Sequence, residues 1–230
     1  MVPYLLYKKK RYASLAYSDP DGEPKRDVKG LALVRRDSCP LVKHTSEKIL
    51  DALLHGRSTA KALAIAQDAA YDLLSGNVPI EQLTITKAFR SGYKPGTCLP
   101  HASVAAKILQ RTTVPVASGT RVPFVYLLNP SNPDSLGHEK AEDVGWAVEK
   151  NLQIDYLHYW DSQLSSPIES LLEVVCPDPL RQIVASEKVA GVLKRLRGEF
   201  AVLARDAKRV RVNTANKQRP LTSFFSPAAP

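Results

Sequence analysis

The sequence has few cysteines and no long apolar run. Cys39, Cys98 and Cys176 are an odd number, lie far apart and include no CxxC pair, so neither a disulfide framework nor a cysteine-built zinc site is expected. Every apolar stretch is interrupted within a few residues, and a lysine cluster soon follows the first residue, so the sequence predicts no transmembrane helix and no signal peptide. We therefore expect an intracellular protein with no membrane partner.

Clusters of catalytic or metal-ligating side chains are also missing. The five histidines are scattered, and no set of His, Asp and Glu recurs at short spacing. Each histidine is better explained as a surface or core residue than as a ligand. The sequence therefore predicts neither a hydrolase nor a metal site within this chain.

Positive charge is plentiful, and it lies at both ends of the chain. The 230 residues have a net charge of +9. Residues 1–43 contain ten Lys or Arg and five Asp or Glu, residues 186–230 contain ten and three, and residues 44–185 contain twelve and fifteen. Basic ends suit a polyanionic partner, because neutralising phosphates releases condensed counterions. A solvated surface that only keeps the protein soluble explains the composition equally well.

Hydrophobic periodicity predicts an α+β fold that is mainly helical. An antiparallel hairpin is expected from residues 4–7 and 12–17, through a turn at 19–22, to a returning strand at 31–35. Helical spacing follows, with a first helix capped by Ser46. Further helices are predicted from 58 or 59 to 76, from 100, over 156–164 and over 168–175, with strands at 83–86 and 124–128.

The basic C-terminal segment is predicted to form a long helix. Apolar residues recur there at 4-3-4-3 spacing: Val189, Leu193, Leu196, Phe200 and Leu203. This seam covers fewer than three heptads, so packing against the protein's own body explains it better than a coiled coil. From residue 213 the chain is polar and rich in proline, and we expect it to be disordered on its own.

Two basic motifs flank the predicted hairpin. In Lys8-Lys9-Lys10-Arg11-Tyr12, strand alternation would place the first, third and fifth residues on one face. Cations beside an aromatic ring suit a phosphate backbone, although lysines also protect edge strands from pairing.

The second basic motif combines Lys29-Gly30 with Arg35-Arg36-Asp37. The glycine permits a close backbone approach, which Lys29 would exploit. Asp37 is expected to pair with one arginine and to leave the other for phosphate.

These motifs belong to a longer family resemblance. Eight segments of the sequence resemble delta-type family B DNA polymerases of eukaryotes and large DNA viruses. In chain order they are KKRY (9–12), DVKG (27–30), VRRDSCPLV (34–42), LTITKAF (83–89), LPH (99–101), SGTRVPFVY (118–126), AED (141–143) and DYLHYWDSQLSSPI (155–168). The likeness is colinear over roughly residues 3–178. It implies part of a DNA-directed DNA polymerase, a nucleotidyltransferase of DNA replication.

The resemblance implies a place for each segment. Residues 1–43 would be the end of the palm and 44–178 the helical thumb, which together hold the primer–template duplex, while 179–212 would be a basic helix. The primer would be touched near its 3′ end, on the minor-groove side, by Lys9, Lys10, Arg11 and Tyr12, which would check pairing geometry without reading sequence. Support of the DNA backbone is implied for Lys29, Arg35 and Arg36, with Gly30 as a further DNA-binding position. Thumb contacts or thumb structure are implied for Lys87 and His101.

The family's catalytic segments do not occur in this sequence. The DxxSLYP and YGDTDS segments, whose aspartates hold two metal ions, and the exonuclease acid motifs are absent. We therefore assign no catalytic residue, expect Mg²⁺ only in the complete polymerase, and expect this chain alone to be inactive. Either a companion chain carries the catalytic palm or the gene product is truncated. The alternative is a non-enzymatic, clamp-binding DNA adaptor derived from a polymerase.

The tail, residues 213–230, carries a second resemblance. Gln218, Leu221, Phe224 and Phe225 match the box by which replication proteins bind the sliding clamp PCNA. One helical turn would gather the three apolar side chains into a plug, with Gln218 as a hydrogen-bonding anchor. A tail that docks on its own protein is the alternative. Together the resemblances imply a nuclear location or a viral replication site.

Overall fold

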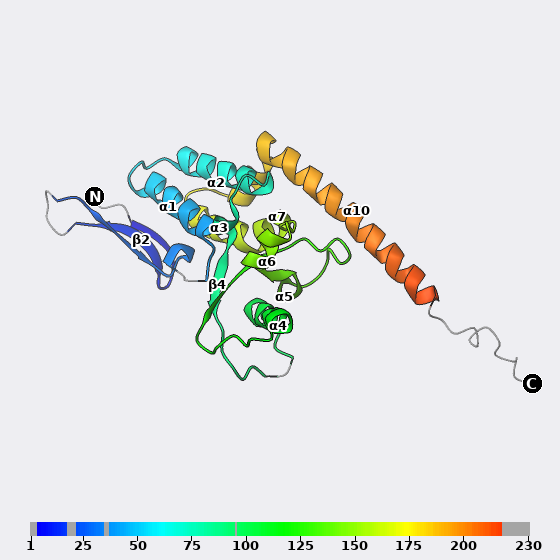
Figure 1. The fold of residues 1–230 in the computed structure, drawn as a ribbon. Helices are drawn as coiled ribbons and strands as arrows, with labels where there is room; N and C mark the ends of the chain where they lie inside the picture. The colour runs from blue at the N-terminus through cyan, green and yellow to red at the C-terminus, as the bar shows by residue number, and fades with distance from the viewer. Residues whose placement is uncertain (1–3, 18–21, 35–36, 95, 218–230) are drawn as a thin grey trace, which may run out of the picture.

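The computed structural model describes residues 4–17, 22–34, 37–94 and 96–217, with side chains for all of these except Ala32 and 211–217. Two small antiparallel sheets and a larger set of helices share one hydrophobic core (Figure 1). The fold is therefore α+β and mainly helical, as predicted. Within the described residues, no helix combines the length and apolar character that a membrane crossing needs.

The N-terminal sheet consists of β1 (Tyr4–Lys8), β2 (Arg11–Ala16) and β3 (Lys25–Lys29), paired in chain order. A turn of Lys9 and Lys10 joins β1 to β2. The strand alternation predicted for residues 8–12 is therefore wrong, because two of the five residues lie outside a strand. Lys10 adopts a φ of 65°, which reverses the chain direction within two residues.

The strand predicted at 31–35 is also wrong. β3 returns earlier, and residues 32–34 form the 3-10 turn η1 (Ala32–Val34). Gly30 has a φ of 71°, and a Cβ at this position would collide with the carbonyl oxygen of Lys10. The chain therefore leaves the sheet at Gly30, and buried Leu31 anchors it to the core.

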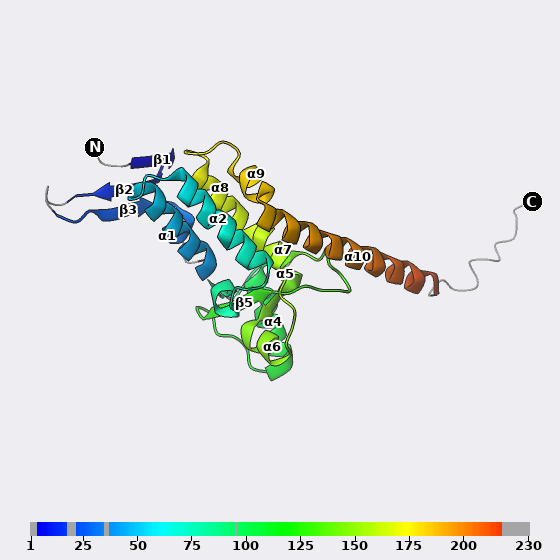
Figure 2. The same ribbon diagram turned by 90° about the horizontal axis from the view of Figure 1, so that it is seen from above.

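The helices α1 (Pro40–Leu54) and α2 (Thr59–Leu74) pack side by side (Figure 2). α2 begins as predicted, because the Ser58 hydroxyl accepts a backbone hydrogen bond at 3.2 Å. α1 begins earlier than predicted. It starts at Pro40, and the N–H that proline lacks would have no intrahelical partner at this first helical position. Ser46 is buried within the helix and does not cap it.

The second sheet consists of β4 (Ile85–Ala88), β5 (Arg121–Tyr126) and β6 (Ala141–Asp143), again antiparallel and in chain order. The short helix α3 (Ile80–Leu83) precedes it. Three helices pack against it: α4 (Pro100–Thr112), α5 (Gly137–Lys140) and α6 (Val144–Glu149). The buried side chains of Ile85 and Phe124 connect this sheet to the common core.

A continuous helical segment lies between the two sheets. It consists of α7 (Tyr156–Tyr159), η2 (Trp160–Leu164) and α8 (Ser165–Leu172), where η2 is one turn of π-helix. π-turns interrupt the regular helix geometry and are frequent at functional sites. The apolar side of this segment packs on α1 and α2, and its polar side faces the N-terminal sheet across a groove.

The chain ends with α9 (Pro179–Ala185) and the long helix α10 (Glu187–Lys217). α10 packs on α2 and α9 and then leaves the body of the protein (Figures 1 and 2). Of the predicted seam, Val189 and Leu193 are buried and the other three residues are half-buried, which confirms packing against the body. Because the helix continues to Lys217, the disorder predicted from residue 213 is wrong for residues 213–217.

Candidate nucleic-acid interface

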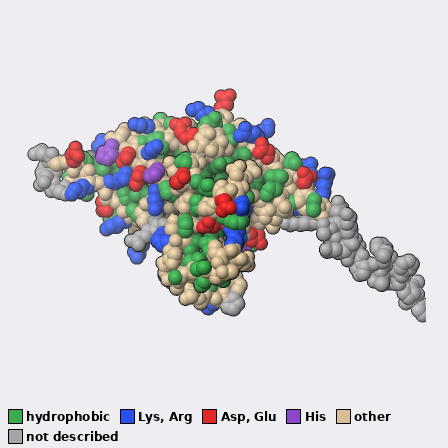
Figure 3. Space-filling model, in the orientation of Figure 1, with side chains coloured by type: hydrophobic (Ala, Val, Ile, Leu, Met, Phe, Trp, Pro, Cys, Tyr) green, Lys and Arg blue, Asp and Glu red, His purple; other side chains and the backbone are tan. Residues whose placement is uncertain are grey.

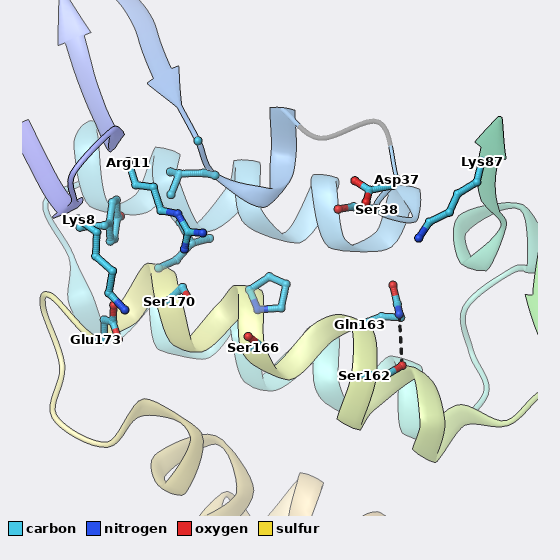
Figure 4. Close-up of a pocket in the computed structure, with 15 residues that line it drawn as sticks. Lys8, Arg11, Asp37, Ser38, Lys87, Ser162, Gln163, Ser166, Ser170 and Glu173 are labelled. Atoms are coloured by element: carbon cyan, nitrogen blue, oxygen red, sulfur yellow. Dashed lines mark hydrogen bonds between the residues drawn. The ribbon is translucent and has the colours of Figure 1, made fainter. Parts of the chain in front are cut away.

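A groove of about 370 Å³ separates the N-terminal sheet from the η2–α8 segment (Figure 4). We call it the central groove. The hairpin, the link from β3 to α1, β4 and the η2–α8 floor all contribute to it. Its lining residues are Tyr7, Lys8, Arg11, Gly30, Leu31, Asp37, Ser38, Lys87, Ser162, Gln163, Ser166, Pro167, Ser170, Leu171 and Glu173.

Cationic side chains enter the central groove from both ends. Lys8 and Arg11 reach in from the hairpin, and Lys87 reaches in from β4 with its ammonium group toward Gln163 (Figure 4). These side chains come from segments more than seventy residues apart in the chain. The fold therefore places positive charge at both ends of the groove, which is also lined by the two carboxylates of Asp37 and Glu173 (Figure 4).

Neutral hydrogen-bonding groups form the floor between these cations. Ser162, Ser166 and Ser170 are four residues apart, so their hydroxyl groups follow one side of the helical segment (Figure 4). The Gln163 amide donates a hydrogen bond to the Ser162 hydroxyl at 3.3 Å. The Ser162 hydroxyl itself donates to the carbonyl of His158 at 2.6 Å. The donors that suit phosphate oxygens are therefore the Ser166 and Ser170 hydroxyls, the Gln163 amide and the cations.

A second groove of similar volume continues from the first. The two grooves share Asp37 and Lys87, and we call the second one the side groove. The Arg121 guanidinium donates to the carbonyl of Thr86 at 2.8 Å, which places it across the β4–β5 edge. The other residues that line the side groove are Ala88, Arg90, Tyr93 and His101.

His101 supports the side groove as a buried and neutral group. Its Nε2 lies 2.9 Å from the Tyr93 hydroxyl, and only 7% of the residue is exposed. Burial, together with the positive charge of Lys87, lowers the pKa of His101. This geometry favours a structural role over a charged contact for His101.

Tyr12 and Lys29 lie on the N-terminal sheet outside both grooves. The Tyr12 hydroxyl donates to Asp27 at 2.8 Å, and its ring stacks on Tyr4 with centroids 5.5 Å apart. The Lys29 ammonium lies 5.8 Å from the centre of the Tyr12 ring. The contacts with Tyr12, and then the charge of Asp27, raise the pKa of Lys29. These residues therefore form an ordered cluster beside the groove entrance.

The structure brings together only some of the site residues named from the sequence. Arg11, Gly30 and Lys87 line the central groove, whereas Lys9 and Lys10 are exposed in the β1–β2 turn. Several further candidates lie outside the described residues: Arg35, Arg36, Gln218, Leu221, Phe224 and Phe225.

Sequence reasoning missed the groove floor and the arginines of the side groove. The serine spacing in DSQLSSPIES is visible in the sequence, but only the fold turns those serines toward the hairpin cations. Arg121 and Arg90 gave no separate signal, because neither belongs to a cluster of basic residues in the sequence. The groove residues missed in this way are Arg90, Arg121, Ser162, Gln163, Ser166 and Ser170.

Two ion pairs hold the second sheet behind the grooves. Arg111 contacts Glu142 with two hydrogen bonds of 2.9 Å. Burial pushes the pKa of Glu142 upward, but hydrogen bonds from Arg111 and from a backbone N–H outweigh it and leave the pKa lowered. Lys140 and Asp155 form the second pair at 2.7 Å, with side chains only 6% and 2% exposed. These pairs connect β6 to α4 and α5 to the start of α7.

The described residues contain no group of three or more His, Cys, Asp or Glu side chains placed to hold a metal ion. The cysteines are free, with Cys39 and Cys176 buried and Cys98 exposed.

Comparison with known proteins decides the family. The model of DNA polymerase family B matches residues 1–175. The chain belongs to this family. A DNA polymerase from Paramecium bursaria Chlorella virus NY2A is 42% identical over 223 residues, which is 97% of this chain and 24% of the viral protein. The DNA polymerase delta catalytic subunit of Caenorhabditis elegans is 36% identical over 79% of this chain and 17% of that subunit.

The fold of this family B polymerase segment also has a solved counterpart. The family B DNA polymerase from the hyperthermophilic archaeon Pyrobaculum calidifontis matches 75% of this chain with a TM-score of 0.59 and 23% identity. The match covers 21% of that protein. The chain thus spans a quarter or less of the length of the relatives it matches.

Proposed function

We propose that this chain is the palm-end and thumb part of a delta-type family B polymerase and that it grips the primer–template duplex by holding backbone phosphates in its two grooves. The central groove carries this proposal. Its cations come from the hairpin and from β4, and its floor offers hydroxyl and amide donors. A replicative polymerase must hold every sequence alike, and contacts to phosphates supply affinity without reading bases.

The grip is tested by neutralising the cations of the central groove. The variant Lys8→Gln/Arg11→Gln/Lys87→Gln should bind a primer–template duplex at least tenfold more weakly. Its plot of log affinity against log salt should be less steep by up to about 2.7, at roughly 0.9 per lost phosphate contact. The matched control replaces three exposed cations elsewhere, Lys48, Lys61 and Arg181, with glutamine. Equal losses in both variants would contradict the grip.

We further propose that the catalytic aspartates and their Mg²⁺ ions belong to a part of the polymerase that lies outside these 230 residues. The support is the absence of DxxSLYP and YGDTDS from this sequence. When bound, the metal ions stabilise the attacking and leaving oxygens of nucleotidyl transfer, while this chain would only position the duplex. Primer extension by the purified 230 residues with Mg²⁺ and nucleotides should give no product. Robust incorporation by the chain alone would overturn the proposal.

Tethering to a PCNA-type sliding clamp is the third part of the proposal. It rests on the Gln218, Leu221, Phe224 and Phe225 pattern, which lies outside the described residues. Replacing both phenylalanines with alanine should abolish clamp binding, because the apolar plug is lost. Duplex affinity should stay nearly unchanged. The site of action would then be the nucleus or a viral replication site.

A further inference from the structure

The outer face of α10 carries a stripe of positive charge that neither groove uses. At about 100° per residue, the four cations Lys194, Arg197, Arg205 and Lys208 fall within roughly 80° of one another around the helix. Arg195 and Arg209 flank this stripe on one side, and all six residues are exposed. None of them lines the central or the side groove. We call these six residues the α10 stripe.

The α10 stripe points away from the body of the protein. The apolar seam that packs on α2 and α9 occupies the other side of the helix, with Val189 and Leu193 buried. Figure 1 shows the distal half of α10 projecting beyond the remaining helices. In the space-filling view, Lys and Arg side chains also appear on the exposed part of this helix (Figure 3). The stripe is therefore open to a large partner.

The few acidic side chains near the α10 stripe neutralise little of its positive charge. Arg195 and Arg209 each have a carboxylate at 3.9 Å, with all four side chains more than 60% exposed, and such loose pairs contribute little. Within the described part of the chain, no carboxylate lies within ion-pair distance of the other four cations. Residues 187–210 contain seven Lys or Arg against three Asp or Glu.

Two glycines lie within the helix, on or beside the same face as the stripe. Gly191 and Gly198 destabilise a helix interior relative to alanine. A Cβ at either position would meet no atom within 4 Å, so packing does not explain them. Their missing side chains leave the helix backbone open to close approach. That is useful when a wide and rigid ligand lies along the helix.

We propose that the α10 stripe is a second binding surface for duplex DNA, separate from the two grooves. From Lys194 to Arg209 the helix advances about 22 Å at 1.5 Å per residue. A duplex presents one phosphate per roughly 1.7 Å of its axis, so it can meet the whole stripe. Four of the six cations are arginines, whose planar guanidinium groups match phosphate oxygens in pairs.

The geometry favours DNA over a membrane surface. An amphipathic helix binds a bilayer by burying its apolar side among the lipids. In α10 the proximal part of that side is already packed against α2 and α9. An acidic protein partner is the competing explanation that the test addresses. Such a partner would use the same positive charges, but their removal would then leave the affinity for DNA unchanged.

The test uses the full 230-residue chain and a duplex of about thirty base pairs. The stripe variant is Lys194→Gln/Arg197→Gln/Arg205→Gln/Lys208→Gln, in which glutamine keeps a high helix propensity. Its matched control neutralises four exposed cations outside the stripe: Lys48, Lys61, Lys150 and Arg181. The stripe variant should bind at least tenfold more weakly than the control, with a salt dependence less steep by up to about 3.6. Circular dichroism should show unchanged helix content.

Combination with the groove variant separates the two surfaces. If α10 binds the duplex independently, the stripe substitutions should weaken binding by a similar factor whether or not Lys8, Arg11 and Lys87 are neutralised. A stripe variant that binds DNA as tightly as the control would overturn the inference. If only the groove variant lost DNA binding, the proposed function of the grooves would stand and the α10 surface would be rejected.

Discussion

Replacing Tyr159 with phenylalanine removes one oxygen atom and leaves two buried backbone groups without a partner. The Tyr159 hydroxyl donates to the carbonyl of Leu83 at 2.8 Å and accepts from the N–H of Tyr126 at 3.1 Å. Only 1% of the residue is exposed. Burial raises the pKa of Tyr159 well above its ordinary value, so the hydroxyl keeps its proton. This group joins α3 and β5 to the segment that forms the groove floor.

The magnitude follows from the two groups that are left unpaired. Each buried donor or acceptor that loses its partner costs about 1–3 kcal/mol. Tyr159→Phe should therefore lower the free energy of unfolding by about 2–6 kcal/mol, since the ring still fills its space and only the hydrogen bonds are lost. Urea denaturation followed by circular dichroism, with linear extrapolation to water, measures this difference.

A matched tyrosine supplies the control. Tyr156 is half-buried, and its ring lies over Gly76 near the surface. Tyr156→Phe should change the free energy of unfolding by less than about 0.5 kcal/mol. If Tyr159→Phe were no more destabilising than Tyr156→Phe, the hydroxyl would not be the link between the second sheet and the groove floor.

Three further predictions concern the elements around the grooves. Glu142→Gln should lower the free energy of unfolding by about 1–3 kcal/mol in urea denaturation, because it breaks a largely buried pair whose Arg111 partner keeps some access to water. Burial lowers the pKa of both His101 and His158. The unfolded chain therefore binds more protons below about pH 6.5, and thermal stability should fall as the pH drops from 7.5 to 5.5. Thermal stability that rises as the pH drops would contradict this assignment. His101→Gln should make the pH dependence of thermal stability weaker. Gly30→Ala should cost about 1–2 kcal/mol or more, because an L side chain is strained at positive φ and its Cβ would collide with a backbone carbonyl. A melting temperature equal to that of the unmodified chain would refute the strain.

Elements with strong local signals were predictable from the sequence. α2 has a serine cap and a regular apolar stripe, α4 begins at a proline, and α10 carries the 4-3-4-3 seam. Each of these features acts within a few residues, so its structural meaning does not depend on the rest of the fold. The start of α1 was missed because Thr45 and Ser46, which resemble capping residues, are buried against the core.

The candidate site was only half predictable, because distant segments build it. The KKRY motif identified the basic hairpin, yet its strand alternation failed at Lys10, whose positive φ has no local sequence signal. Arg11, Lys87 and Ser166 meet in one groove although the first and last are 155 positions apart. Periodicity predicts which side chains share a face of one element, but not which elements face each other.

A photochemical cross-link from the groove floor tests the central claim most directly. Ser166→Cys in a Cys98→Ser background, labelled with a short aryl azide, places the reactive group among the groove cations. Upon irradiation with a primer–template duplex, this position should cross-link strongly to DNA, and excess unlabelled duplex should suppress the product. Ala64→Cys, on the exposed side of α2, should give little product under the same conditions. Equal cross-linking at the two positions, or none at Ser166, would show that duplex DNA does not occupy the groove.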